Sequence, residues 1–459
     1  MDGKHIHLVG IGGIGLSAIA RVLLSRGYRV SGSDPASGPI TESLAAAGAE
    51  IYTRHRAENI SPDTDLVIVS SAIGPDNPEV RAAMAQGIRV AKRREILSEL
   101  AADFKTIAVA GSHGKTTTTA LVALILTDAG FDPTAIIGGI VPEFASNARA
   151  GRGEYFVIEA DEYDYAFLGL APYVAVITNV DYDHPDIFPT RSDYAAAFGE
   201  FAHRVHSDGT LIVCGQDGGA VEAASRATAR VERYGLDADL NWQAVNVRAN
   251  DAGGSTFTVM REGEKIGEIV LRIPGTHNVL NALAALVAAD AVAVPFATAA
   301  QTLERYTGTS RRFQLLGEFG GVAIVDDYAH HPSEIRATLA AARERYPGRR
   351  LWAVFQPHTF TRTRALMDEF AQAFGAADIV IITEVYPARE KETLGVSGRD
   401  LVARMKHRDV RFIATLDGTA DYVERRIAPG SVLVTLGAGD VNGVAQRLAE
   451  SRDVQRART

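Results

Sequence analysis

A short glycine-bearing stretch contains the residues with the clearest chemical potential in this chain. The segment 108–119 reads AVAGSHGKTTTT; an apolar run at 106–110 leads into it, and a predicted helix follows it. This is the arrangement of a phosphate-binding loop, because loop N–H groups and a helix N-terminus attract phosphate oxygens. Lys115 is placed to reach the terminal phosphates, and the Thr116 hydroxyl to hold Mg²⁺. The segment therefore predicts a nucleoside triphosphate site.

The spacing of this loop departs from the common G-x-x-x-x-G-K-[ST] pattern. Val109 occupies the position of the first glycine, and only two residues separate Gly111 from Gly114. The alternative interpretation is a glycine-rich turn whose lysine is there by chance. The register of strand, loop and helix favours the phosphate site. The residues predicted to bind nucleotide in this loop are Gly111, Ser112, His113, Gly114, Lys115, Thr116 and Thr117.

A second glycine-rich loop lies near the N-terminus. The segment 10–15, GIGGIG, follows a predicted strand at 5–9, and a second predicted strand at 28–32 ends at Ser33 and Asp34. This is typical of a dinucleotide-binding βαβ unit, in which the acidic residue accepts a bond from a ribose hydroxyl. The pattern specifies a pyrophosphate and a ribose more strongly than nicotinamide. NAD, FAD and UDP-linked ligands therefore stay open, as does a tight turn without a ligand.

Acidic side chains follow two predicted strands of the middle region, which we expect to be adjacent. The strand at 155–158 ends in Glu159, and the strand at 174–177 leads to a loop that contains His184. The carboxyl ends of parallel strands share one edge of a sheet, so both clusters are expected near the phosphate loop. Glu159 is a candidate Mg²⁺ ligand, whereas His184 suits this ion less because Mg²⁺ prefers oxygen. A solvated acidic loop is the alternative for 161–164.

Three further loops carry polar side chains at predicted strand ends. Ser71 begins a turn-rich loop, and Asn147 lies in a predicted loop at 147–149. His330 and His331 are adjacent in a later loop. Adjacent loop residues rarely point at one ligand, so a structural or substrate-facing role is favoured over metal binding.

Composition limits the classes of protein that fit. A length of 459 residues suggests about three domains. The net charge of −9 argues against a general nucleic-acid binder, which would need a basic surface. Cys214 is the only cysteine, which excludes an internal disulfide and a cysteine metal cage. With no secretory signal pattern and no apolar run of the roughly 20 residues that a membrane span needs, we expect a soluble cytoplasmic protein.

Strands and helices alternate in each part of the chain, which predicts α/β domains with doubly wound sheets. The middle part also carries a predicted hairpin of strands 255–261 and 265–273. The predicted domains are 1–102, 103–308 and 309–459.

In their order along the whole chain, these motifs resemble those of the Mur ligase family. The resemblance rests on residues 10–15, 111–116, 159–162, Asn179 with 183–186, 277–281, 311–313, 326–332, 356–358 with Arg362, and 437–440. The shortened phosphate loop is the family's own form, with Ser112 where threonine is usual. The resemblance implies an N-terminal Rossmann-like UDP-binding domain, a central P-loop ATPase-type domain with a mostly parallel sheet, and a C-terminal Rossmann-like domain that binds an amino acid.

The family resemblance also implies an activity, namely an ATP-dependent ligase of peptidoglycan precursor synthesis. Such an enzyme joins L-alanine to the lactyl carboxylate of UDP-N-acetylmuramate through an acyl phosphate. Its cofactors are ATP and Mg²⁺, for which Mn²⁺ can substitute. No nucleic acid or membrane partner is implied, and a monomer or homodimer is expected. The alternatives left open are a recycling ligase that attaches a murein tripeptide to the same sugar, an NAD-dependent dehydrogenase, and a regulatory ATP-binding module.

The resemblance assigns roles to individual residues. The residues expected to be catalytic are Lys115, Glu159, His184, His358 and Arg362. Those expected to hold the metal are Thr116, Glu159 and His184. Outside the phosphate loop, those expected to bind the nucleotide are Asn278, Asn281, Arg312 and Asp327. Those expected to bind the sugar nucleotide or the amino acid are Gly12, Gly13, Ile14, Ser33, Asp34, Ser71, Asn147, His330, His358 and Arg362.

Overall fold

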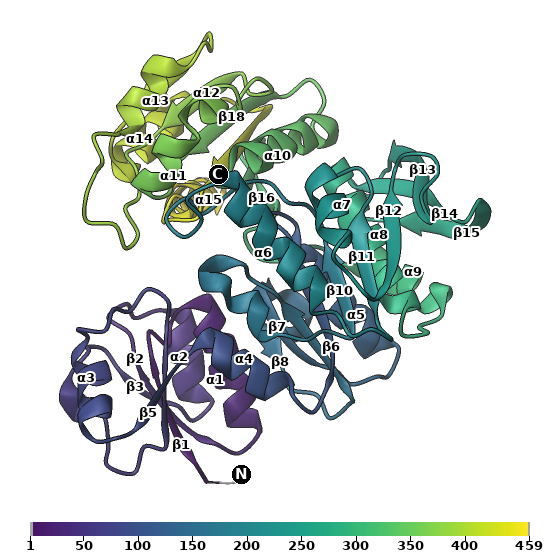
Figure 1. The fold of residues 1–459 in the computed structure, drawn as a ribbon. Coiled ribbons are helices and arrows are strands. Elements are labelled where there is room, and N and C mark those ends of the chain that lie inside the picture. Colours follow the sequence, from purple (N-terminus) through teal and green to yellow (C-terminus); the bar gives the residue numbers. More distant parts are fainter. Residues whose placement is uncertain (1–2, 458–459) are drawn as a thin grey trace.

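The computed structural model describes residues 3–457. Within that range, sheets of five, ten and six strands follow one another along the chain, each accompanied by helices (Figure 1). Most neighbouring strands are parallel, as alternating strands and helices predict. The expected three-domain α/β fold is confirmed. None of the helices in the described range is long and apolar enough to cross a membrane.

The N-terminal sheet has the order β3-β2-β1-β4-β5 and is parallel throughout. Its strands are β1 (His5–Val9), β2 (Arg29–Ser33), β3 (Glu50–Tyr52), β4 (Leu66–Val69) and β5 (Arg89–Lys92). Its helices are α1 (Ile14–Ser25), α2 (Pro39–Ala46), η1 (Ala57–Asn59), α3 (Pro78–Ala85) and α4 (Arg93–Ala101). Because β2 and β4 lie on opposite sides of β1, the glycine loop after β1 sits where the strand order reverses. This is where open α/β sheets bind ligands.

The central sheet has the order β15-β14-β13-β12-β11-β10-β6-β9-β7-β8. Its strands are β6 (Lys105–Ala110), β7 (Thr134–Val141), β8 (Ser146–Arg149), β9 (Tyr155–Glu159), β10 (Val174–Ile177), β11 (Thr210–Cys214), β12 (Arg230–Gly235), β13 (Trp242–Ala249), β14 (Ser255–Arg261) and β15 (Glu264–Val270). Its helices are α5 (Lys115–Asp128), η2 (Pro142–Phe144), η3 (Tyr163–Gly169), α6 (Arg191–His203), α7 (Gly218–Ala224), α8 (Thr276–Asp290) and α9 (Phe296–Arg305). The predicted hairpin is confirmed as β14 and β15, an antiparallel pair.

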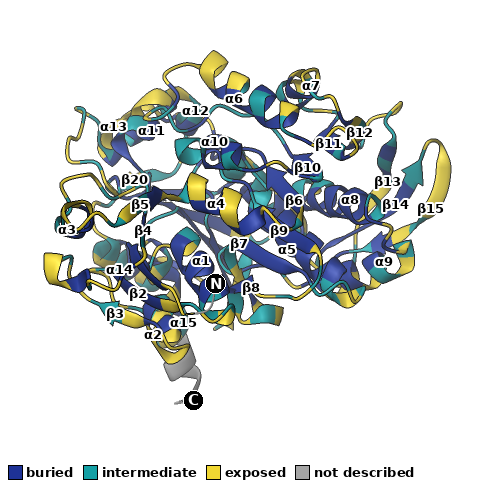
Figure 2. Cartoon of the chain, turned by 60° about the horizontal axis from the view of Figure 1, so that its bottom comes forward, coloured by how far each residue is buried: buried dark blue, intermediate teal, exposed yellow. Residues whose placement is uncertain are grey.

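The strand of the phosphate loop occupies the middle of this sheet. β6 pairs with β10 on one side and β9 on the other, all parallel. The expectation that the two acid-bearing strands are adjacent is therefore wrong, because β6 separates them. Helix α5, which follows the loop, is buried continuously from Thr116 to Leu126 (Figure 2). The phosphate loop is thus fixed at both ends by buried elements.

The C-terminal sheet has the order β16-β17-β21-β18-β19-β20, with β16 antiparallel to β17 and the rest parallel. Its strands are β16 (Gln314–Phe319), β17 (Val322–Asp327), β18 (Arg350–Phe355), β19 (Ile379–Ile382), β20 (Val410–Phe412) and β21 (Ser431–Leu436). Its helices are α10 (Pro332–Arg345), α11 (Phe360–Ala365), α12 (Met367–Ala371), α13 (Gly398–Arg404), α14 (Leu416–Arg426) and α15 (Asn442–Ala457). Two separate apolar clusters lie against this sheet, one containing Phe355 and the other containing Val354. Because neighbouring strand residues point to opposite faces, both faces of the sheet are covered.

The first two sheets share a hydrophobic core. One apolar cluster runs from Leu23 of α1 and Leu97 of α4 to Phe156 of β9 and Phe167 of η3. Figure 1 shows α1 and α4 beside β7 and β8. The third sheet has cores of its own and meets the central one through polar and ionic contacts, among them Arg362 with Asp183.

The loop expected at 147–149 is wrong, because these residues belong to β8, which pairs with β7 at the edge of the central sheet. Asn147 is buried there, and its Nδ2 donates to the carbonyl oxygen of Ile14 at 2.7 Å and to Ser17 Oγ at 3.0 Å. This predicted substrate residue therefore fastens α1 to the central sheet. Its side chain therefore adds hydrogen bonds to the apolar contacts that join α1 to the central sheet.

Candidate active site

The phosphate loop has a shape that only glycine allows at two positions. Gly111 has φ +136°, and a Cβ there would lie 1.9 Å from Thr178 Oγ1. Gly114 has φ +81°, and a Cβ there would lie 2.3 Å from Asn281 Oδ1. Since L side chains rarely adopt these angles and neither site has room, both glycines are required by the geometry. The loop is packed tightly against β10 and α8.

Lys115 begins α5 and points its ammonium group into an acidic cluster. Its Nζ lies 2.9 Å from Glu162 Oε2 and donates to the carbonyl oxygen of Ser112 at 3.1 Å. Glu162 is only 1% exposed. Burial opposes the charge on Lys115, but the carboxylates of Glu162 and Asp161 raise its pKa. The lysine is thus a buried cation held beside the loop.

Glu159 ends β9 on the other side of the same loop. One carboxylate oxygen accepts the Gly138 N–H at 2.7 Å, and the other accepts the Thr116 hydroxyl at 3.2 Å. Burial raises the pKa of Glu159. A carboxylate and a hydroxyl are oxygen donors of the kind that Mg²⁺ takes. His184, in contrast, lies against Glu162, with 3.6 Å between Nε2 and Oε1.

Arg362 forms a buried ion pair that joins the C-terminal sheet to the central one. Its Nε and Nη2 donate to the two carboxylate oxygens of Asp183 at 2.6 and 3.1 Å. Both residues are almost fully buried. Despite the cost of burial, Arg362 holds the pKa of Asp183 well below its usual range. This predicted amino-acid ligand therefore has a structural partner already, and its Nη1 lies 3.2 Å from His358 Nδ1 at the lining of the cavity.

Two of the neighbouring histidines, His358 and His330, have lowered pKa values. Burial and the charge of Arg362 lower the pKa of His358 to about 2. Burial likewise lowers the pKa of His330 to about 4, although Glu334 opposes the shift. Both imidazoles can therefore exchange hydrogen bonds with a ligand at neutral pH without carrying a charge.

These groups line one cavity to which all three sheets contribute. The contributors that the sequence predicted are Ile14, Ser112, Gly114, Lys115, Glu159, His184, Arg312, His330, His358 and Arg362. Arg389 and Tyr163 also line it, with the guanidinium of Arg389 4.4 Å from the centre of the tyrosine ring. The start of α1, the phosphate loop and the segment after β18 therefore face one another across this cavity.

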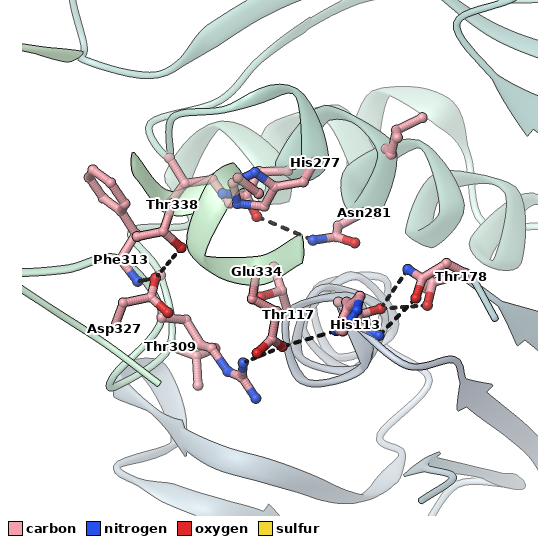
Figure 3. A pocket seen from close by; sticks show the side chains of 18 of the residues that line it. His113, Thr117, Thr178, His277, Asn281, Thr309, Phe313, Asp327, Glu334 and Thr338 are labelled. Atoms are coloured by element: carbon pink, nitrogen blue, oxygen red, sulfur yellow. Dashed lines mark hydrogen bonds and ion pairs between the residues drawn. The ribbon is translucent and has the colours of Figure 1, made fainter. Parts of the chain in front are cut away.

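A second cavity opens on the other side of the phosphate loop (Figure 3). Asp327, at the end of β17, accepts N–H bonds from Phe313 at 2.8 Å and Ala329 at 2.7 Å. Burial raises the pKa of Asp327 to about 6 and lowers the pKa of His277 to about 4. The remaining predicted nucleotide residues in its lining are His113, Gly114, Thr117, Asn278, Asn281 and Arg312.

The N-terminal glycine loop is held by its own acidic residue. Asp34 Oδ2 accepts the Gly12 N–H at 3.0 Å, and Oδ1 accepts the Ala36 N–H at 2.9 Å. Gly13 N–H closes the turn onto the Gly10 carbonyl at 3.1 Å. Asp34 thus orders the loop itself, in addition to its predicted role.

Other predicted N-terminal residues lie around this loop. Ser33 is buried and donates its hydroxyl to Glu79 at 2.6 Å. Ser71 lies in the turn after β4. Ile14, the first residue of α1, is 37% exposed and faces the shared cavity.

Three acidic residues that the sequence analysis did not single out organise the site. Glu162 pairs with Lys115, Asp183 with Arg362, and Glu334 with the phosphate-loop residue His113. The first two lie inside motifs already noted, but nothing local showed which cation each would meet. For Glu334 the sequence held a local signal, because its spacing from His331 is that of a capping box. In the structure its side chain accepts the His331 N–H at the start of α10.

Three family models match the chain in succession. They are "Mur ligase family, catalytic domain" over residues 5–105, "Mur ligase middle domain" over 109–289 and "Mur ligase, glutamate ligase domain" over 311–439. The chain belongs to the Mur ligase family. The phosphate loop and the residues that line the three-sheet cavity lie within the matched ranges.

Close relatives of this Mur ligase carry one name. A UDP-N-acetylmuramate–L-alanine ligase of Geobacter sp. (strain M21) is 44% identical over 97% of both chains. The protein of the same name from Nitratidesulfovibrio vulgaris (strain DP4) is 45% identical over 97% of this chain and 98% of its own. The similarity therefore extends across all three sheets.

Solved structures of Mur ligases have the same fold. A UDP-N-acetylmuramate-alanine ligase from Thermotoga maritima superposes with a TM-score of 0.84 at 30% identity, covering 98% of this chain and 99% of its own. A murein peptide ligase from Psychrobacter arcticus 273-4 gives a TM-score of 0.76 at 27% identity, covering 98% of both chains. The TM-score and the sequence identity are both higher for the UDP-N-acetylmuramate-alanine ligase than for the murein peptide ligase.

Proposed function

We propose that this Mur ligase joins the amino group of L-alanine to the lactyl carboxylate of UDP-N-acetylmuramate and cleaves ATP to ADP and phosphate. The observation that carries the proposal is the single cavity at which α1, the phosphate loop and the end of β18 meet. Each sheet can deliver one substrate to it. The names of the relatives at 44–45% identity support this choice of sugar nucleotide and amino acid.

We assign one substrate to each part of the chain. Residues 1–102 hold the sugar nucleotide, with its pyrophosphate at the glycine loop before α1. Residues 103–308 hold ATP, and residues 309–459 hold L-alanine. Adenine lies against the neutral ring of His277, and Asp327 accepts bonds from the ribose. The triphosphate would pass Gly114, which lines both cavities, to reach Lys115 in the cavity shared by the three sheets.

In the first step, a lactyl carboxylate oxygen attacks the γ-phosphorus of ATP, and ADP leaves. Phosphoryl transfer needs charge neutralisation and positioning more than a protein nucleophile. Lys115 supplies a positive charge. To do so, its ammonium group must leave Glu162 and bind phosphate oxygens instead. Thr116 and Glu159 would hold Mg²⁺, with His184 close to the same cavity, and the ion would neutralise further phosphate charge. The product is an acyl phosphate.

In the second step, the amine of L-alanine attacks the acyl carbon. The C–N bond forms, the C–O bond to phosphate breaks, and the attacking nitrogen loses one proton to the departing phosphate. His358 and His330 are neutral and so orient the amine by hydrogen bonds. Arg362 and Arg389 are positive groups in the lining of the cavity that can receive the carboxylate, Arg362 by exchanging its Nη1 contact with His358.

The test is phosphate release from ATP by the purified protein. We expect release that requires both UDP-N-acetylmuramate and L-alanine. Glycine and L-serine should replace L-alanine weakly, because one methyl group contributes only about 1–3 kcal/mol and an added hydroxyl is rejected weakly. Efficient ligation of the murein tripeptide without use of free L-alanine would assign the chain to recycling. Tight NADH binding without sugar-nucleotide binding would indicate a dehydrogenase.

Gly12→Val should raise KM for UDP-N-acetylmuramate about tenfold or more, which corresponds to about 1.4 kcal/mol. A Cβ at Gly12 would lie 2.9 Å from Asp34 Oδ2 and would fill the place where a pyrophosphate approaches the backbone. KM for ATP should change far less. Initial rates at varied concentrations of each substrate measure both constants. Gly375→Val, at a glycine with nothing within 4 Å of its Cβ, is the control.

Lowering the pH from 7 to 5 should raise KM for ATP, because Asp327 takes up a proton as the pH falls through about 6. A protonated carboxyl accepts fewer bonds from the ribose. Above pH 7 this contribution should be constant. The measurement compares Asp327→Asn with the unchanged chain over the same pH series, so that the ionisation of ATP itself cancels. Parallel pH curves would assign the effect to another group.

A further inference from the structure

Two histidines and an aspartate converge at the contact between the central and C-terminal sheets. One side-chain atom from each of His113, Asp181 and His331 lies within 4.8 Å of the other two. His113 Nε2 is 3.1 Å and His331 Nδ1 is 3.5 Å from Asp181 Oδ2. The group joins the phosphate loop, the segment after β10 and the start of α10.

Each converging nitrogen has a protein partner that a bound cation would replace: His113 Nε2 faces Asp181 Oδ2, and His331 Nδ1 accepts the Ser333 N–H. His113 Nδ1 lies 3.2 Å from Glu334 Oε1 (Figure 3), and its Nε2 lies 3.1 Å from Asp181 Oδ2. Both carboxylate oxygens can only accept, so the metal-free ring carries a proton on each nitrogen, and Zn²⁺ would take the place of the proton on Nε2. His331 Nε2 lies 3.2 Å from the Tyr182 carbonyl oxygen, which can only accept. His331 Nδ1 therefore carries the lone pair, and the Ser333 N–H points at it from 3.3 Å.

This is the outer-shell pattern of metal-binding histidines. Such histidines donate their second ring N–H to a carboxylate or a backbone carbonyl, which fixes the tautomer and the ring orientation. Here Glu334 serves one ring and the Tyr182 carbonyl the other. The Ser333 hydroxyl also donates to Asp181 Oδ2 at 2.6 Å and holds that oxygen in place.

We propose that His113, Asp181 and His331 form a Zn²⁺ site that fastens the phosphate loop to the C-terminal sheet. Two imidazoles and one carboxylate are a common Zn²⁺ ligand set, and they leave a fourth position open for water. Mg²⁺ prefers oxygen ligands, so these histidines separate the site from the pair of Thr116 and Glu159. The proposal does not depend on which amino acid the enzyme ligates.

Zinc at this site would bridge two sheets that also meet through hydrogen bonds and ion pairs. Asp181 and His113 come from the central sheet and His331 from the C-terminal one, so bound Zn²⁺ links them directly. Zinc should therefore stabilise the arrangement in which α10 contacts the phosphate loop. The alternative is that His113 remains a protonated imidazole between Asp181 and Glu334 and the cluster is only an ion pair.

The test is equilibrium dialysis of the full chain against ZnCl₂ in excess Mg²⁺, with bound zinc counted by atomic emission. We expect one tightly bound Zn²⁺ per chain and its loss in His331→Ser, a change that keeps a good helix N-cap for α10. His206→Ser, which alters an exposed histidine elsewhere, should bind zinc like the unchanged chain. Circular dichroism checks that each variant is folded.

Two further variants protect the test against a simple folding defect. Asp181→Asn keeps the shape of the side chain and should lower zinc affinity by removing a charged ligand. Glu334→Gln removes the carboxylate that faces His113 Nδ1 and should weaken zinc binding by about 10–100-fold. Absence of tight zinc binding by the unchanged chain would overturn the site, as would equal binding by His331→Ser. Either result would leave the cluster as an ion pair.

Discussion

Lys115→Ala lowers the turnover number by about 10²–10³-fold or more, because it removes a preorganised charge at the phosphoryl group. The structure places this residue at the start of α5, in the lining of the cavity shared by the three sheets. Single-turnover formation of ADP is the measurement, since it isolates the chemical step from product release. Substrate affinity should fall less than the rate.

Stability needs its own control in this experiment. Lys115 neutralises the buried Glu162, so its removal alone leaves an uncompensated buried carboxylate. Lys115→Ala combined with Glu162→Gln removes both charges and should unfold at a temperature closer to that of the unchanged chain. If this double variant is folded and still turns over normally, Lys115 has no part in the chemistry.

Asp183→Ala costs about 3–5 kcal/mol, the penalty for leaving one member of a buried ion pair without its partner. The unpaired group is Arg362, whose Nε and Nη2 both donate to Asp183. Because the pair joins two sheets, the loss should appear as weaker docking of the C-terminal sheet. Hydrogen exchange of amides after β10 and in α11 measures that docking, and ligation should fall with it.

A double variant separates the ion pair from the size of the side chains. Asp183→Ala with Arg362→Leu removes both charges, so it should recover much of the lost stability, while ligation stays impaired. Arg191→Ala disrupts an exposed ion pair with Glu369 across the same two sheets and should cost about 0–1 kcal/mol. Equal costs for the buried and exposed pairs would contradict this account.

Local sequence predicted the parts of the site that depend on local geometry. The phosphate loop was readable because Gly111 and Gly114 occupy backbone angles that only glycine adopts easily, between a buried strand and a buried helix. The strand ends that carry Glu159 and the Asp183–His184 segment were readable for a related reason. Apolar runs predict buried strands, and polar residues that follow them lie at the sheet edge.

Contacts between residues that are far apart in the sequence could not be predicted from it. The position of β6 between β9 and β10 is a matter of strand order, and connections through helices leave several orders open. The ion pair of Arg362 joins it to a residue 179 positions away, so no spacing rule could connect them. The prediction of Asn147 as a loop residue failed because SNAR has no apolar alternation, yet it forms an edge strand against β7.

The apolar cluster that runs from α1 and α4 into β9 and η3 bears on how this enzyme unfolds. Elements that share one core gain or lose their buried surface together, so the first two sheets should melt as a single cooperative block. The C-terminal sheet, with cores of its own and a charged boundary, forms a second block that can detach while remaining folded. Calorimetry should therefore resolve two transitions for three sheets. Added salt should lower the temperature at which the two blocks separate, because it screens charges more than it affects apolar packing.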